Sequence, residues 1–474
     1  MRSALRKMGM LAGILALCLL PARAQDPAGA DPSASGTGTQ ADTSTGQTAV
    51  PDTLPLSGAQ TLTTGGILTR HSFLLPSLNV TAQADSNRQQ LPVTSWDSVQ
   101  AQMYLMGRIG LVQVSGRSEL TLDYQGGRSV SVYQNLGDSM VHSLRLAETV
   151  RGRRWSLLLG GQGSYLSESA FGLGNAGGLD AYGVGSSSGF GGLIGGAVPA
   201  FQSGLLPSQS ISTQNVERIS ATGIVQTSFK LNSRASLTFF GSYGILQFRD
   251  AQFFDSSQIV SQAGYEVQLS KKNTISINFR FGNFRFPGQG QEINTYVPNF
   301  SYARRLTGRL SWQISAGPQF LEISPVAALQ RQMSWSASTA LSYQLQRFNL
   351  GINYDHSITG GSGLLLGAET DQVQGTVSRQ MNRRLRGSLA AGFANNQGVS
   401  LASVSAISGA LQSWFGSARM DWRVGQRSNF FLAYNARLQG ANTPGCLGSL
   451  CALTSVNHQV SAGFNLAFKP VVLH

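Results

Sequence analysis

The chain has 474 residues, of which 12% are charged and 9% aromatic, with 56 glycines and a formal net charge of +13. Soluble globular proteins usually have about a quarter of their residues charged, so this composition argues against an ordinary soluble protein. The mean hydropathy of −0.04 argues against a bundle of membrane helices, whose long apolar runs would raise it. No cluster of basic residues on a predicted helix accompanies the positive charge, so we expect no nucleic-acid partner.

The first 24 residues have the pattern of a secretory signal peptide. Three basic residues precede an apolar core over residues 8–20, and Ala22-Arg23-Ala24 provides a small-residue cleavage site, with the cut after Ala24. The core is shorter than the roughly 20 residues that a membrane helix needs. Cys18 follows Leu17, where a lipoprotein signal would need a small residue, so we do not expect lipidation.

Residues 25–76 are expected to form a disordered leader in the periplasm. As far as about Thr64 they are mostly Ala, Gly, Ser, Thr, Pro and Asp, with almost no large apolar side chain. Such a segment cannot bury enough apolar surface to offset the entropy lost on ordering. The folded part is therefore predicted to be 77–468, followed by a short tail over 469–474.

From residue 77 onward, apolar and polar side chains alternate in long runs. One run places Leu310, Trp312 and Ile314 on one face and Arg309 and Ser311 on the other. A period of two predicts a strand with one apolar and one polar face. Most runs are long enough to cross a membrane as tilted strands, which together with the signal peptide favours a transmembrane β-barrel.

Short polar turns separate pairs of these runs and recur roughly every 35–45 residues apart from one long gap, a spacing that suits two membrane strands plus one longer loop. We expect the short turns on the periplasmic side and the longer glycine-rich loops outside the cell. The eight predicted turns lie at 115–117, 151–154, 231–234, 270–273, 305–308, 346–347, 381–384 and 425–428.

The longest predicted loop, 166–214, contains no Lys or Arg and is expected to join the fifth and sixth strands. Its Gly172, Gly174 and Gly177 match the dinucleotide pattern G-x-G-x-x-G, but neither a buried strand before it nor a helix after it is predicted. No cofactor is therefore expected. The loop resembles in its position the constriction loop of general porins; an ordinary mobile extracellular loop is the alternative.

Cys446 and Cys451 are expected to form a disulfide, because two nearby cysteines in an exported protein most simply pair with each other. A metal site is the alternative, but no His or carboxylate lies close by in sequence. We therefore expect no metal.

The stretch 457–468 alternates cleanly and ends in a recognisable motif. Ser461, Gly463, Leu466 and Phe468 follow the order polar, glycine, hydrophobic, hydrophobic. This motif resembles the C-terminal β-signal of outer-membrane barrels, although Lys469 and five further residues trail behind it. The resemblance implies that the last strand is recognised by the barrel-assembly machinery.

The region from Leu78 to Phe468 resembles outer-membrane β-barrels of Gram-negative bacteria, in the porin-like class. Lipid offers the backbone no hydrogen bonds, so the sheet must close on itself. Eight hairpins plus one strand at each end, Leu78–Asp85 first, predict an all-β, closed antiparallel barrel of about 18 strands, with 16 as the alternative. An even number of strands then places both termini in the periplasm. The resemblance implies that the barrel lies in the lipid of the outer membrane.

Alternation also predicts which charged side chains face the lumen. More of them are basic than acidic, which has two interpretations: paired charges that stiffen a hydrated wall, or clustered arginines that bias a pore toward anions. The cluster would be Arg386, Arg419, Arg423 and Arg437, and the further pore-lining charges are Arg280, Arg309, Glu266 and Asp421.

Three functions are compatible with these features. The first is a channel for passive diffusion of small hydrophilic solutes. The second is a structural or secretion-related barrel that binds a partner through its loops or leader. The third is an outer-membrane enzyme, which needs a nucleophile, a base and an orienting group within reach. The five His residues are scattered, and His356 lies beside Asp355 on the opposite face of a strand, so we expect no enzyme.

Overall fold

The computed structural model describes residues 72–85, 100–131, 139–166, 218–249, 253–324, 330–345, 348–360, 365–399, 410–425, 427–442 and 455–473. The predicted signal peptide, nearly all of the leader, the loop after residue 166 and the Cys446–Cys451 pair lie outside these ranges and remain predictions. No helix in the described ranges is long and apolar enough to cross a membrane.

The described chain is almost entirely β-structure, with one short 3-10 helix, η2 (Pro287–Gln289), between β9 and β10. Its strands are β1 (Ser72–Asp85), β2 (Gln100–Ser115), β3 (Ser118–Ser131), β4 (Ser139–Arg151), β5 (Trp155–Leu166), β6 (Arg218–Lys230), β7 (Ala235–Phe248), β8 (Ser256–Gln268), β9 (Asn273–Phe286), β10 (Gln291–Arg305), β11 (Leu310–Ser324), β12 (Gln330–Gln344), β13 (Phe348–Thr359), β14 (Ala368–Gln380), β15 (Leu385–Gly398), β16 (Ala410–Arg423), β17 (Ser428–Asn442), β18 (Ser455–Ala467) and β19 (Val471–Leu473).

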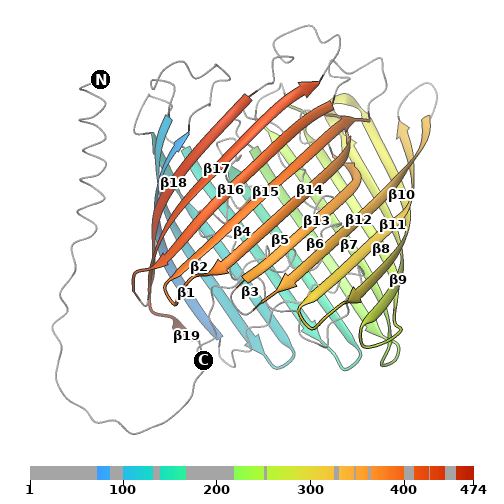
Figure 1. The fold of residues 1–474 in the computed structure, drawn as a ribbon, viewed down its shortest axis with the longest axis horizontal. Helices are drawn as coiled ribbons and strands as arrows, with labels where there is room; N and C mark the ends of the chain where they lie inside the picture. Colours follow the sequence, from blue (N-terminus) through green and yellow to red (C-terminus); the bar gives the residue numbers. More distant parts are fainter. Residues whose placement is uncertain are drawn as a thin grey trace, which may run out of the picture. The chain divides into compact units, whose positions relative to one another are not determined.

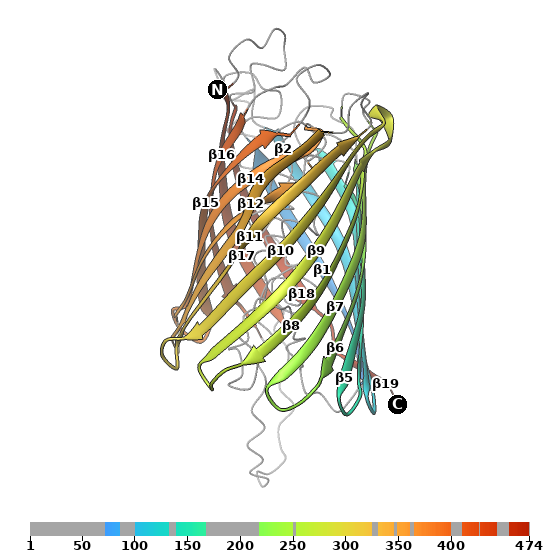
Figure 2. The same cartoon turned by 90° about the vertical axis from the view of Figure 1, so that its right-hand side faces the viewer.

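Each strand pairs antiparallel with its sequence neighbours, and β1 closes the sheet by pairing with β18 (Figure 1). The closing register runs from Ser77 opposite Ala467 to Asp85 opposite Gln459. The prediction of a closed antiparallel barrel with 18 strands is confirmed; the three-residue β19 only extends the closure. Figure 2 shows the strands crossing the wall obliquely, as closure of a twisted sheet requires.

The eight predicted turns fall at eight short connections that gather at one end, here called the short-turn end; a further short connection, which contains η2, joins β9 to β10 at the other end. The opposite end is called the loop end. The first strand differs from the expectation, because β1 begins at Ser72 and not near Leu78. Its extra residues pair with β19, so Val471–Leu473 is a paired strand and not a free tail. Both extensions follow from closure, because each edge supplies the other with backbone partners.

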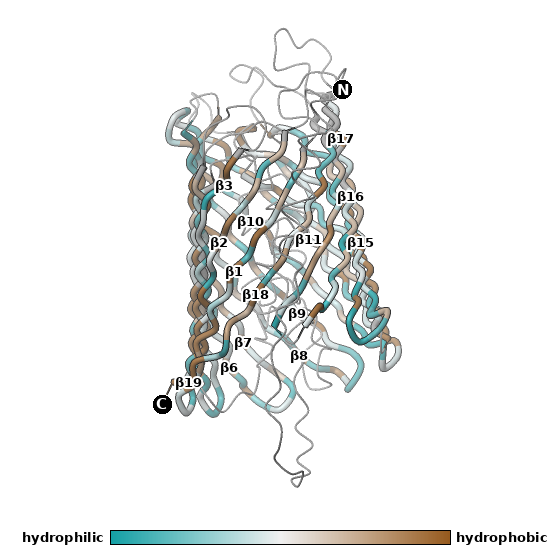
Figure 3. The backbone as a smooth tube through the Cα atoms, turned by 90° about the vertical axis from the view of Figure 1, so that its left-hand side faces the viewer, coloured by the Kyte–Doolittle hydropathy of each residue, from teal (hydrophilic) through white to brown (hydrophobic). Residues whose placement is uncertain are grey.

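The two faces of the wall differ as alternation predicts. In β18 the side chains of Val460 and Phe464 are exposed on the outside, whereas Gln459 and Ser461 are buried on the inside. Large apolar side chains such as Ile277, which is 63% exposed, cover the outside. Figure 3 shows apolar and polar residues following one another along the strands, with hydrophilic residues in the short turns. Such an outer surface fits lipid and not water.

Gly463 of the predicted β-signal lies where the barrel closes. A Cβ at this position would lie 2.4 Å from Phe431 Cε1 and 2.6 Å from Thr81 Oγ1. Phe431 is 2% exposed and faces inward from the neighbouring strand β17. The glycine therefore makes room for an aromatic ring that covers the closing strand from inside.

We predict that Gly463→Val destabilises the closed barrel by about 1–3 kcal/mol, because the added side chain overpacks the closure. On unheated gels, less of the variant should migrate as the compact folded form. Gly440→Val in β17 is the matched control, since a Cβ there meets nothing within 4 Å. Equal folded fractions for both variants would show that the closure tolerates the extra volume.

Candidate functional site

The wall of the barrel is incomplete between two strands at the loop end. β12 and β13 pair from Gln344–Asn349 as far as Ala337–His356, and there their pairing stops. Beyond that point β12 continues to Gln330 against β11 alone, and β13 continues to Thr359 against β14 alone. The two strands therefore separate at the loop end, and we call the opening between them the seam.

Near the seam, the apolar side chains of β9 to β11 switch from the outer face of the wall to the inner face. In β9, Phe279 faces outward, yet Phe284 and Phe286 are buried on the inside. On the outside, polar residues take over at the same level: Arg285 Nε lies 3.6 Å from Glu292 Oε1, and Glu322 is bonded to Arg331 at 3.0 Å. At its loop end this part of the wall is thus polar outside and apolar inside, the reverse of its membrane portion.

A hairpin covers this inner apolar surface. We call residues 357–359, at the end of β13, together with residues 365–369, which lead into β14, the tucked hairpin. Its Ile358 and Leu366 are buried in one cluster with inner-face residues of β9, β10 and β11. The cluster consists of Phe284, Phe286, Ile293, Leu321, Ile323, Ile358 and Leu366. Burying each large apolar side chain contributes roughly 1.5–3 kcal/mol, so the cluster holds the hairpin firmly.

Two further contacts fix where the hairpin lies. Gln291 Nε2 donates a hydrogen bond to the carbonyl of Leu366 at 3.3 Å. Gly367 has a φ of +84° and passes so close to β10 that a Cβ would lie 2.3 Å from Ile293 Cδ1. The hairpin therefore forms a second layer inside the wall, behind β12, and narrows the barrel at the loop end.

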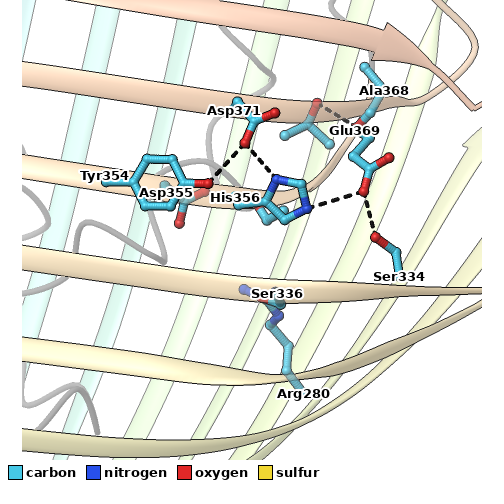
Figure 4. Close-up of polar contacts among 11 residues, drawn as sticks. Arg280, Ser334, Ser336, Tyr354, Asp355, His356, Ala368, Glu369 and Asp371 are labelled. Atoms are coloured by element: carbon cyan, nitrogen blue, oxygen red, sulfur yellow. Dashed lines mark hydrogen bonds and ion pairs between the residues drawn. The ribbon is translucent and has the colours of Figure 1, made fainter.

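Polar side chains line the seam where the hairpin leaves the wall (Figure 4). His356 is stacked on Trp335 with ring centroids 4.0 Å apart, and its side chain is 6% exposed. Its Nδ1 lies 2.7 Å from Asp371 Oδ1, and its Nε2 lies 3.1 Å from Glu369 Oε1. Ser334 Oγ donates to the same Glu369 oxygen at 2.5 Å. Glu369 thus connects β12 to the hairpin.

This group contains a hydroxyl, an imidazole and carboxylates, which are also the groups of a serine hydrolase. A nucleophilic serine needs its hydroxyl against a free imidazole nitrogen. Here both nitrogens of His356 lie against carboxylates, and Ser334 donates to Glu369. Among the described residues, no group of three or more His, Cys, Asp and Glu is placed to hold a metal. The arrangement fits a structural contact between hairpin and wall.

Below the seam, two ionic contacts lie on opposite walls of the barrel. Arg280 of β9 reaches Ser336 of β12 with an Nη2–Oγ distance of 3.3 Å and interacts electrostatically with Asp355. Half a turn of the barrel away, Arg108 of β2 binds Asp123 of β3 through Nε at 2.9 and 3.1 Å. Both groups are at least partly buried on the inner face. The mid-barrel wall therefore carries basic side chains that each lie near an acidic one.

The other predicted pore-lining residues are spread along the inner wall. Arg419 binds Asp421 on its own strand at 2.7 Å, and its guanidinium lies 4.4 Å from the centre of the Phe431 ring. Arg386 lies opposite Asp421 in the register, and Arg423 is the last residue of β16. These four charged residues gather toward the short-turn end.

Arg437 does not lie at the level of this group. It is opposite Phe415, nearer the loop end, and its side chain is outside the described part of the chain. Glu266 faces inward from the short-turn end of β8 and is 3% exposed. The four arginines predicted to cluster therefore do not share one level of the barrel.

Arg309 lies just outside the strands. It is an exposed residue of the turn before β11, so its place among the pore-lining charges remains a prediction. The Thr307 hydroxyl accepts from the backbone N–H groups of Arg309 and Leu310 at 3.2 and 3.0 Å. This turn keeps residue 309 out of the strand, and the alternation begins one residue later.

Comparison with models of known protein families finds no match, and comparison with curated protein sequences finds none either. Solved structures with similar barrels include three from Pseudomonas aeruginosa. OccK2 (OpdF), in complex with glucuronate, is 12% identical over 84% of this chain and 98% of its own, with a TM-score of 0.43. OpdK with vanillate is 10% identical over 84% of this chain and 99% of its own, with a TM-score of 0.41. OccK9 (OpdG) is 11% identical over 84% and 98%, with a TM-score of 0.43. At such low identity and TM-scores the likeness does not extend to a ligand.

The tucked hairpin was not predicted from the sequence, although one signal for it exists. The sequence 279–286 carries Phe at both odd and even positions, so the apolar face switches between Phe281 and Phe284. The same switch occurs between Phe320 and Leu321 in β11. An inward-facing apolar run in a wide barrel requires something inside to cover it.

We predict that Ile323→Ala lowers the free energy of unfolding in detergent micelles by about 2–5 kcal/mol, because Ile323 is fully buried against the hairpin. Ile277→Ala on the outer face of β9 is the control and should cost clearly less, since that side chain is exposed to the surrounding detergent. Equal losses in urea titrations would contradict the packed layer.

Proposed function

We propose that this protein is an outer-membrane channel for passive diffusion of small hydrophilic solutes, with a preference for anions. One observation carries the proposal: the barrel closes with 18 strands, with polar side chains inside and apolar ones outside. Barrels of eight strands are filled by their own side chains, whereas 16–18 strands leave room for an aqueous path. Such a wall separates lipid from water.

The anion preference follows from the inner charges. Among inward-facing described residues, Arg108, Arg280 and Arg419 have acidic neighbours, and Arg386 lies opposite Asp421 in the register; Lys230 and Arg423 add basic groups, which the inward-facing Glu266 offsets in part. A charged wall acts on ions over about 10 Å at 0.1 M salt, which covers much of a narrowed pore. The tucked hairpin narrows the path at the loop end, above Arg280, whereas Arg386, Arg419 and Arg423 act nearer the short-turn end.

Export and assembly complete the proposal. The signal peptide would direct the chain to the periplasm, and the motif Ser461, Gly463, Leu466 and Phe468 would deliver it to the barrel-assembly machinery. The short-turn end would then face the periplasm. The Cys446–Cys451 disulfide would close a short extracellular loop before the last strand.

Selectivity tests the proposal directly. We predict that replacing Arg386, Arg419, Arg423 and Arg437 by Gln moves the reversal potential in a salt gradient toward cation preference, most visibly at low salt. Insertion should survive, because lumen substitutions tune selectivity more than stability. The measurement uses purified protein in planar bilayers.

The control removes four positive charges from the outer face. Arg128, Arg304, Arg331 and Arg379 are exposed on outward-facing positions of their strands. Their replacement by Gln changes the net charge by the same amount and should leave the reversal potential unchanged. A shift of equal size in both quadruple variants, or in neither, contradicts the anion preference.

A further inference from the structure

We propose that the tucked hairpin is a gate with two positions. In the first, which the structure shows, it lies inside the barrel against β9 to β11. In the second, residues 357–359 of β13 extend their pairing onto β12 and complete the wall at the seam. The inference rests on the proposed channel function, because the gate changes the width of the solute path.

The sequence of β13 fits the wall position as well as the tucked one. Continuing the register from Ala337 opposite His356 would place Ser357 opposite Ser336, and then Ile358 opposite Trp335. Ile358 would then stand beside Trp335, which is 52% exposed on the outer face, and Ser357 would face the lumen. In β13 the apolar residue would then meet lipid and the hydroxyls water, as in the rest of the wall, while Glu369 of β14 would turn to the outer face opposite Ile358.

The two positions present opposite faces of the hairpin to Ser334. In the tucked position Ser334 touches Glu369, which belongs to the face directed at β12. Thr359 points the other way: its hydroxyl lies 3.0 Å from Thr370, which donates to Asn396 on β15 at 2.9 Å. In the wall position the same register would bring Thr359 opposite Ser334 and turn Glu369 to the outside. Ser334 therefore contacts one residue or the other.

His356 is placed at the hinge between the two positions. It is in the last residue pair that joins β13 to β12, and it stacks on Trp335 there. Its contact with Asp371 lies within the β13–β14 pairing, so it survives in both positions. Glu369 lies on the same face of that pairing, so only the contact between Ser334 and Glu369 belongs to the tucked position alone.

The tucked position is the dominant one. It buries Ile358 and Leu366 against five inner apolar side chains, which the wall position would leave facing the lumen. The wall position gains backbone hydrogen bonds along the seam in return. The gate is therefore mostly closed and opens rarely, and a loss of buried apolar surface shifts it toward the open position.

Two cysteine pairs that share one residue distinguish the positions. In full-length protein carrying Cys446→Ser and Cys451→Ser, Ser334→Cys with Glu369→Cys captures the tucked position. Ser334→Cys with Thr359→Cys captures the wall position. With a short bis-methanethiosulfonate cross-linker in outer-membrane fragments, the first pair should cross-link rapidly and the second slowly. Ile358→Ala should speed the second by roughly tenfold, because it removes buried apolar surface.

The cross-linked proteins are then compared in planar bilayers. The tucked cross-link should give a steady, small conductance, the wall cross-link a larger one, and dithiothreitol should restore wild-type behaviour in both. Absence of the second cross-link where the first forms, or equal conductances of the two locked forms, would overturn the gate. The variant Leu366→Ala, with no introduced cysteine, provides an independent test in planar bilayers. More frequent large openings support the gate, and an unchanged opening frequency contradicts it.

The two proposals fail in different ways. If wild-type protein in bilayers gives no conductance, the channel function is wrong, whereas the rates of the two cross-links, which are read on gels, still decide whether the hairpin changes position. If conductance is present but only the first pair cross-links, the channel stands and the gate is wrong.

Discussion

The demand that every backbone amide in lipid find a hydrogen-bond partner determines this structure. An open sheet would leave the edges of β1 and β18 unpaired, so the sheet closes, and the register at the closure fixes the barrel. β19 and the start of β1 extend this pairing past the end of the alternating stretch. Gly463 then makes room for Phe431 over the closing strand.

The seam between β12 and β13 is where this constraint is relaxed. It begins at Ala337 and His356, where Trp335 and Met333 are still exposed on the outside, and continues to the level of the polar residues Glu322 and Arg331. Toward the loop end, water and side chains can satisfy backbone groups, so the two strands can separate there. The freed hairpin folds inward and covers the apolar inner surface of β9 to β11. The separation of β13 from β12 and the inward packing of the tucked hairpin therefore occur together.

Local pattern was sufficient to predict the barrel but not its interior. Period-two alternation and polar turns depend only on neighbouring residues, and they located the eight turns of the short-turn end and the number of strands, but not the short connection between β9 and β10. Alternation does not show that Arg309 belongs to a turn, because one hydroxyl, that of Thr307, decides where that turn ends. His356 was considered beside Asp355, whereas its contacts are Asp371 and Glu369 on the next strand. Those contacts depend on register and on a fold-back that alternation does not encode.

The central claim is that the inner face of the barrel meets water while the outer face meets lipid. Neighbouring positions on β15 test it most directly: Ser388 faces inward, and Leu389 is exposed on the outside. Single cysteines at these positions, with Cys446 and Cys451 replaced by Ser, would be treated with a water-soluble maleimide in outer-membrane fragments. We expect rapid labelling at 388 and little at 389. Equal labelling at both positions, or labelling at 389 alone, would contradict the claim.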